Sequence, residues 1–205
     1  GVEDSGGTKL ICLSGNVNHR GTFEVPIGGV TLRDIIFDPE FGGGIPDGKE
    51  LKAYHLGGQS GPIGFSEQLD TRYDHTSLKK QGLSIGSGAV VVLDDTVCII
   101  DYLKKVSEFF LHESCGKCVP CREGNRQLYM ILHKFANGLA TEKDFERMER
   151  LSFTMATASS CGLGQSATAA LDSCLLHRRE EFQAHIDGIC PVCLNSRKYG
   201  DQYAY

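Results

Sequence analysis

Four cysteines in the second half of the chain have a spacing that suits iron ligation. Cys115, Cys118 and Cys121 stand at C-x2-C-x2-C spacing, and Cys161 follows 40 residues later. Three thiolates from one loop and a fourth from a distant segment are a common ligand arrangement of 4Fe-4S clusters. Zinc more often takes two pairs of ligands, and three ligands at successive two-residue gaps crowd a single tetrahedron. The pattern therefore favours a 4Fe-4S cluster over zinc, and unligated thiols are the third alternative.

The residues beside these thiols suit a negatively charged cluster. Pro120 is typical of a first helical position, and the free amide groups of a helix start favour bound negative charge. Lys117 and Arg122 can supply positive potential that raises a reduction potential, or they can simply be solvated. No further cysteine followed by proline comes three residues after Cys121, so the bacterial ferredoxin run is excluded.

A second set of potential metal ligands lies near the end of the chain. His185, Cys190 and Cys193 form an H-x4-C-x2-C pattern, and Cys98 is a candidate for the fourth ligand. Three cysteines and one histidine make a common closed structural zinc site. Zinc or a related metal is the favoured hypothesis, while free thiols and a second iron–sulfur site stay open as alternatives. His185 as an ordinary helix-end residue is the alternative for the histidine.

Composition narrows the class of protein. Nine cysteines, an odd number clustered at short spacings, indicate metal ligation rather than a disulfide framework. A net charge of -5 argues against nucleic acid as a partner, and the longest apolar run, residues 89–93, is far too short for a membrane span. No secretion leader is recognisable, so a cytoplasmic location is expected. We find no nucleophile pattern and assign no catalytic residue.

The elements that must position these residues change in character near residue 95. Residues 1–95 hold most of the 25 glycines, and their short apolar stretches alternate with a period of two. The expected elements are strands at 8–17 and 21–25, a helix whose start is capped by Thr31 and Asp34, and strands at 51–56 and 89–93. This order predicts a small β-grasp domain over residues 1–95.

From residue 96 onward the apolar period becomes about 3.6. Four helices with short connections are expected over residues 96–188, the last running from about residue 167 toward Gly188. The predicted fold class is therefore α+β, with a β-grasp domain followed by a four-helix bundle carrying the 4Fe-4S cluster. Residues 189–205 are expected to form a tail that contributes to the second metal site. The two remaining cysteines, Cys12 and Cys174, are expected to be buried in the core.

Three stretches of sequence resemble one known family. The ten residues from Glu113 to Arg122, the segment from Cys161 to Ala167, and the segment from Leu13 to Asn18 resemble the C-terminal part of the flavoprotein subunit of respiratory complex I. The diaphorase subunits of NAD(P)-linked hydrogenases and formate dehydrogenases share that architecture. The resemblance covers nearly the whole chain.

The resemblance implies a fold and a function. It implies a soluble-ligand-binding β-grasp (SLBB) domain, and a helical domain in which Cys115, Cys118, Cys121 and Cys161 ligate a 4Fe-4S cluster. That cluster would relay single electrons between a reduced FMN and other iron–sulfur centres. In hydrogenase-type relatives a comparable histidine and cysteine set holds a metal, although its last two cysteines are usually four residues apart rather than two.

The family binds NADH and FMN in a preceding α/β domain with a glycine-rich loop, and no such loop is found in this sequence. The chain alone is therefore not expected to oxidise NADH. The implied partners are a flavin- and NAD(P)H-binding domain or subunit and other iron–sulfur subunits, of the 2Fe-2S thioredoxin-like, ferredoxin-like, hydrogenase or formate dehydrogenase types. The expected location is cytoplasmic, or peripheral on a membrane-bound complex. The alternative hypothesis is a non-redox docking module whose cysteines hold structural zinc.

Overall fold

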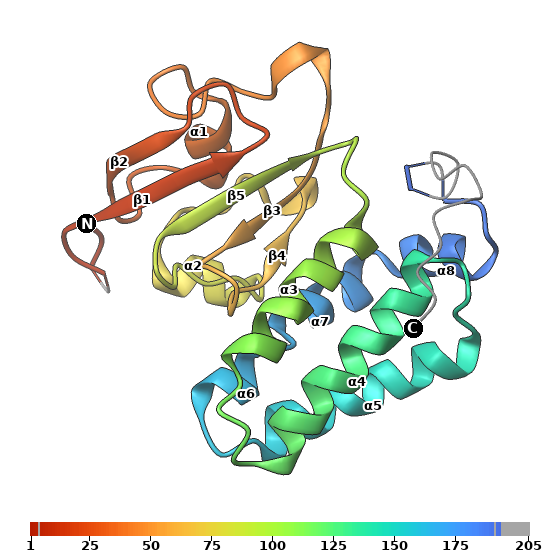
Figure 1. Ribbon diagram of the computed structural model, residues 1–205. Coiled ribbons are helices and arrows are strands. Elements are labelled where there is room, and N and C mark those ends of the chain that lie inside the picture. The colour runs from red at the N-terminus through yellow and green to blue at the C-terminus, as the bar shows by residue number, and fades with distance from the viewer. Residues whose placement is uncertain (4, 191, 194–205) are drawn as a thin grey trace. The chain divides into compact units, whose positions relative to one another are not determined.

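The computed structural model describes residues 1–3, 5–190, 192 and 193 (Figure 1). It divides into two compact units, residues 1–96 and 97–205. The first is built on a β-sheet and the second is helical, so the predicted α+β class is confirmed. Residues 194–205, most of the expected tail, lie outside the described residues. None of the helices in the described part of the chain has the length and apolar character that crossing a bilayer requires.

The first unit contains a five-stranded mixed sheet with the order β2-β1-β5-β3-β4. Its strands are β1 (Thr8–Gly15), β2 (Gly21–Pro26), β3 (Leu51–Leu56), β4 (Ile63–Gly64) and β5 (Ala89–Asp94). β1 and β2 form an antiparallel hairpin, and β1 runs parallel to the central strand β5. A hairpin, a helix and a last strand inserted beside the first make the β-grasp arrangement that the element order predicts.

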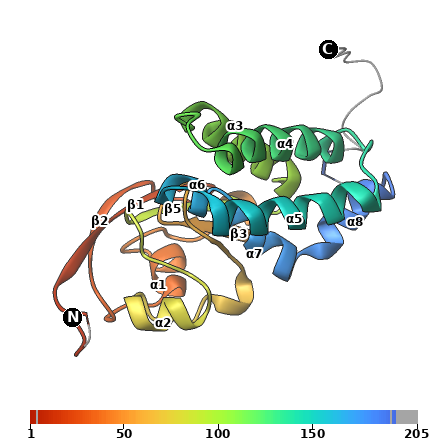
Figure 2. The same cartoon turned by 90° about the horizontal axis from the view of Figure 1, so that it is seen from below.

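Two helices cover one face of this sheet (Figure 2). Helix α1 (Leu32–Phe37) begins at the expected capping box, in which Thr31 and Asp34 each bond the other's backbone N–H. Helix α2 (His75–Lys80) and the short strand β4 are additions that the sequence did not predict. The core joins apolar residues of α1 and α2 to those on one face of the strands, including Ile11, Leu13, Leu32, Ile35, Ile36, Leu78, Val90 and Val92.

The expectation that Cys12 is buried is wrong. On β1, Ile11 and Leu13 point into the core, whereas Cys12 is exposed and lies opposite Thr22 of β2. Successive side chains of a strand point to opposite faces, so a residue between two core positions must lie on the other face. Cys174, the other cysteine assigned to the core, is fully buried as expected.

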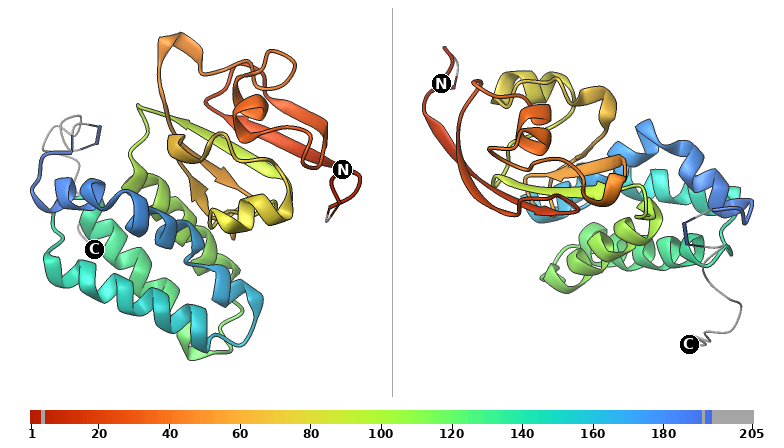
Figure 3. Two further views of the ribbon diagram at one scale, coloured as in Figure 1. Left: turned by 180° about the vertical axis from the view of Figure 1, so that it is seen from behind. Right: turned by 90° about the horizontal axis from the view of Figure 1, so that it is seen from above.

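The second unit is helical throughout (Figure 3). Its helices are α3 (Ile99–Glu113), α4 (Val119–Ala136), α5 (Glu142–Ala158), α6 (Gly162–Ser166), α7 (Ala169–His177) and α8 (Arg179–Ile186). α3 packs along α4, and α4 packs along α5. α5 begins at the capping box of Thr141 and Asp144, where Lys134 also pairs with Asp144 at 2.9 Å.

The expected fourth helix is interrupted. Arg178 leaves the helical region, with φ -140° and ψ 42°, and separates α7 from α8. The break changes the direction of the chain so that Phe182 of α8 is fully buried. Its ring makes edge-on contacts with Phe135 and Phe145, at centroid distances of 5.6 and 5.7 Å. Aromatic packing therefore decides the course of this segment, although its apolar residues would also fit one longer helix.

Candidate metal centres

The first candidate centre begins in the loop between α3 and α4. Ser114 ends α3 in an extended conformation, and Gly116 follows with φ +76°, a left-handed conformation that glycine adopts without strain. The Nη1 group of Arg122 donates a 2.7 Å hydrogen bond to the Gly116 carbonyl oxygen. Arg122, expected to act through its charge, thus also fixes the loop that carries Cys115 and Cys118.

The three thiols of this loop differ in exposure. Cys115 is exposed, Cys118 is half-buried, and Cys121, in the first turn of α4, is only 4% exposed. Pro120 occupies the second position of α4, one residue later than expected, where its missing N–H costs no helical bond. The loop therefore presents its sulfurs in order from the solvent to the interior.

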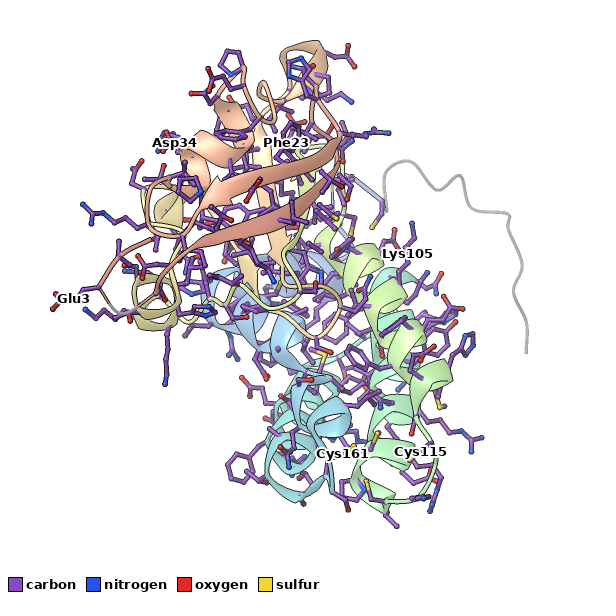
Figure 4. All side chains as sticks on the ribbon, turned by 90° about the vertical axis from the view of Figure 1, so that its left-hand side faces the viewer. Glu3, Phe23, Asp34, Lys105, Cys115 and Cys161 are labelled. Atoms are coloured by element: carbon purple, nitrogen blue, oxygen red, sulfur yellow. The ribbon has the colours of Figure 1, made fainter. Side chains whose placement is uncertain are left out.

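The fourth thiol comes from the connection between α5 and α6. Cys161 is exposed and stands at the N-cap of α6. The backbone N–H of Ser160, next to it, donates to the Cys118 sulfur and, with the N–H of Cys121, lowers the pKa of Cys118. A methyl group on Gly164 would lie 3.0 Å from Cβ of Cys121, so the α6 turn lies directly against α4. Cys115 and Cys161 lie at the same end of the helical unit (Figure 4).

The spacing of these four thiols fits a cluster better than a single ion. Within the described ranges, the group of cysteine, histidine and carboxylate donors whose ligand atoms all lie within 4.8 Å of one another is a different one. A single zinc ion needs four donors about 2.0–2.3 Å from one centre, whereas a 4Fe-4S cluster spreads its four thiolates over four irons. The donor set and the packing of Gly164 fit such a cluster.

That other group is the second candidate centre, and it consists of Cys98, His185, Cys190 and Cys193. All four side chains are buried. The Cys98 sulfur lies 3.3 Å from Nε2 of His185, and the Cys193 sulfur lies 3.6 Å from both Nε2 and the Cys190 sulfur. The structure thus gathers the four residues that sequence spacing suggested, from the start of α3, the last turn of α8 and the residues after it.

His185 is oriented as a metal ligand would be. Its Nδ1 lies 2.8 Å from the carbonyl oxygen of Phe135. A carbonyl oxygen only accepts, so Nδ1 carries the hydrogen and the lone pair of Nε2 faces the sulfurs of Cys98 and Cys193. This is the arrangement by which backbone groups fix the tautomer of a ligating histidine.

The electrostatics of the second centre call for a cation. Burial raises the pKa of the Cys98 thiol, and burial together with the neighbouring Cys98 thiol raises that of Cys193. Negative charge is therefore costly in this group of sulfurs unless a positive charge joins it. With three sulfurs and one imidazole nitrogen, the donor set fits zinc.

Two residues near the first centre were missed by sequence reasoning. Ser114 and Asn125 both contact the Cys121 sulfur. Asn125 follows Cys121 by four residues on the same helix, and that spacing places two side chains on one helical face. The spacing was readable from the sequence, whereas the contact of Ser114 depends on the loop conformation.

Comparison with known proteins supports the first centre. Residues 101–185 match the family model described as the NADH-ubiquinone oxidoreductase-F iron-sulfur binding region. The chain is 39% identical, over 94% of its length, to the NADP-reducing hydrogenase protein HndC of Solidesulfovibrio fructosivorans, of which it covers 39%. It is also 39% identical, over 91% of its length, to an F-type component of the NADH-quinone oxidoreductase of Rhizobium meliloti, of which it covers 44%.

A solved structure agrees with these relatives. The crystal structure of an NAD⁺-reducing [NiFe]-hydrogenase in its H2-reduced state matches 90% of this chain with a TM-score of 0.80 and 32% identity, over 30% of that chain. The chain spans about two fifths of the length of the curated relatives it matches.

Proposed function

Because residues 101–185 belong to the 4Fe-4S binding region of the NADH-ubiquinone oxidoreductase F family, we propose that Cys115, Cys118, Cys121 and Cys161 ligate one 4Fe-4S cluster. The observation that carries this assignment is the meeting of two distant segments at Cys121. The Ser160 amide bonds the Cys118 sulfur, and Gly164 packs on Cβ of Cys121. All four thiols therefore belong to one end of the helical unit.

The proposed role is electron relay. When bound, the cluster supplies one-electron transfer at a potential set by its surroundings. Cys121 fixes the buried side of the site, and Cys115 and Cys161 form the exposed side, which a redox partner can approach. The loop bond from Arg122 to Gly116 holds Cys115 and Cys118 in place.

The proposed larger protein is an NAD(P)H-linked flavin and iron–sulfur oxidoreductase. The relatives are named for reactions of NADH, NADP or NAD⁺, and each is more than twice as long as this chain. We place the FMN and NAD(P)H sites in a domain or subunit other than these 205 residues. Further iron–sulfur subunits would pass the electrons on, in the cytoplasm or on the surface of a membrane-bound complex. The β-grasp unit, as an SLBB domain, would dock the flavin domain or another subunit.

The second centre is proposed to bind one zinc ion through Cys98, His185, Cys190 and Cys193. The observation that carries it is the burial of four donors within 4.8 Å of one another, with His185 held by the Phe135 carbonyl. Its role would be structural, because a closed four-ligand site leaves no position for a substrate. The two alternatives for these thiols, free cysteines and a second iron–sulfur site, are distinguished by metal content.

One measurement tests both assignments. Protein purified without oxygen should contain about four irons, about four sulfides and about one zinc per chain, and it should give an EPR signal on reduction. Cys121→Ser should remove the iron and leave the zinc, and Cys12→Ser, at an exposed cysteine of the other unit, should change neither. Zinc in place of iron at the first centre would support the docking-module hypothesis instead.

A further inference from the structure

Two polar side chains converge on one sulfur of the first centre. The Ser114 Oγ atom lies 3.3 Å from the Cys121 sulfur, and Nδ2 of Asn125 lies 3.4 Å from it. Ser114 ends α3, and Asn125 belongs to α4. Asn125 is 1% exposed, so its amide is shielded from water on the buried side of the site.

The direction of both hydrogen bonds follows from the chemistry. A ligating cysteine is a thiolate and carries no proton, so it can only accept. Asn125 presents its NH2 group, which is a donor. The Ser114 oxygen already accepts from the backbone N–H of Gly116 at 3.3 Å, which leaves the hydroxyl hydrogen for the sulfur. Both contacts are therefore donors to Cys121.

Hydrogen bonds to a charged acceptor in a buried site are stronger than bonds between neutral groups. A reduced cluster carries one more negative charge than an oxidised one, and part of that charge resides on its thiolates. Donors to a ligand sulfur therefore stabilise the reduced form more, and hydrogen bonds to sulfur are among the factors that set cluster potentials. Cys121, the most buried of the four proposed ligands, has two side-chain donors.

We infer that Ser114 and Asn125 are positioning residues that hold the Cys121 sulfur and raise the reduction potential of the cluster. This inference rests on the proposed ligation by Cys121. It concerns residues outside the cysteine motif, and it gives each a separate role. Asn125 supplies the donor from within α4, and Ser114 supplies the donor that depends on the Gly116 turn.

The test is the midpoint potential of anaerobically purified chain, followed by EPR in a redox titration. Asn125→Leu removes the donor at similar size and should lower the one-electron equilibrium constant about tenfold, a shift of about 59 mV to more negative potential. Asn125→Asp replaces the donor with a carboxylate and should lower the potential further when that carboxylate is ionised. Gln127→Leu, the matched change at an exposed position of α4, should leave the potential unchanged.

The order of the variants separates electrostatics from folding. A purely structural role for Asn125 would not place Asp below Leu, and equal potentials in wild type, Asn125→Leu and Asn125→Asp would overturn the inference. If the Asn125 variants lose their iron, Ser114→Ala decides the question, because Ser114 is only partly buried and its hydroxyl can be removed with little change in packing. Its potential should fall by a smaller amount, and an unchanged value would also overturn the inference. Wild-type chain without iron would instead contradict the proposed ligation.

Discussion

At the scale of single residues, His185 connects the second centre to the helical core. Its Nδ1 group bonds the Phe135 carbonyl in the last turn of α4, and its Nε2 atom faces the sulfurs of Cys98 and Cys193. One side chain therefore makes contacts with three parts of the helical unit that are far apart in sequence. Loss of any thiol around it would remove a metal ligand and leave the histidine in place.

Cys190→Ser should therefore release the metal of the second centre. A serine hydroxyl is a poor ligand for zinc, which prefers thiolate and imidazole at this kind of site, so zinc should fall from about one per chain to near zero. The iron content and the EPR spectrum should not change, because Cys190 lies outside the first centre. Metal analysis of the purified variant checks this, with Cys12→Ser as the control at an exposed thiol. Unchanged zinc would indicate that Cys190 is a free thiol.

His55 on β3 predicts a dependence of stability on pH. Burial lowers its pKa below the ordinary value of 6.5, and its bond to the Gly61 carbonyl offsets only part of that shift. As the pH falls below about 6.5, the unfolded chain takes up the proton first, so the free energy of unfolding of the first unit should fall. Hydrogen-exchange protection of β3, corrected for intrinsic rates, measures this. His55→Gln should weaken the pH dependence, and His19→Gln, at an exposed position, should preserve it.

Residue spacing predicted which side chains could act together, but not the surroundings of each. The C-x2-C-x2-C run and the terminal histidine and cysteines are local patterns, and the structure brings each set to one place. Their ligation of metal stays a prediction. Cys12 was misjudged because the expectation did not apply the alternation of β1 to it, although Ile11 and Leu13 beside it take the core face. The contact of Ser114 could not be predicted, since it depends on the turn at Gly116.

At the scale of elements, the short helix α6 controls how the Cys161 segment meets α4. A methyl group on Gly164 would lie 2.6 Å from Cβ of Ser159 and 3.0 Å from Cβ of Cys121, closer than packed carbon atoms allow. Gly162, two residues earlier in the same helix, has no such neighbour within 4 Å. The two glycines therefore form a natural pair for comparison.

Gly164→Ala should separate α6 from α4 and reduce the iron content. Overpacking of this kind costs about 1–3 kcal/mol, and here the strain falls on the side chain of a proposed ligand. Gly162→Ala should retain the iron, because its methyl group would meet open space. Iron per chain and the EPR intensity of the two variants, purified side by side, measure the difference. Equal iron in both would show that the approach of α6 to Cys121 is not needed for the cluster.

The elements that the sequence predicted are those with a long or regular apolar pattern. The hairpin, α1 with its capping box, β3, β5 and the three long helices all occur close to their expected positions. β4, α2 and α6 are six residues or shorter, too brief for a period to be recognised. The break at Arg178 was missed because it is stabilised by contacts of Phe182 with Phe135 and Phe145, which are distant in sequence.

At the scale of the whole molecule, both candidate centres belong to the helical unit, and the β-grasp unit contains neither. Removal of zinc by a strong chelator should therefore act on one unit. Hydrogen-exchange protection should fall in α8 and in the first turn of α3, where His185 and Cys98 lie, while β1 and β5 should keep theirs. Equal loss in both units, or no loss in either, would argue against a structural metal.

The position of Cys98 in the chain gives the second centre a further effect. Cys98 and His185 are 87 residues apart, near the two ends of the helical unit, and their side chains meet at 3.3 Å. An ion that stayed bound to both would close a loop around nearly the whole unit and restrict the unfolded chain as a disulfide does. For a covalent link of this length the loss of loop entropy corresponds to about 4–5 kcal/mol at 25 °C. The ion would then stabilise the bundle partly by limiting the conformations available to the unfolded chain.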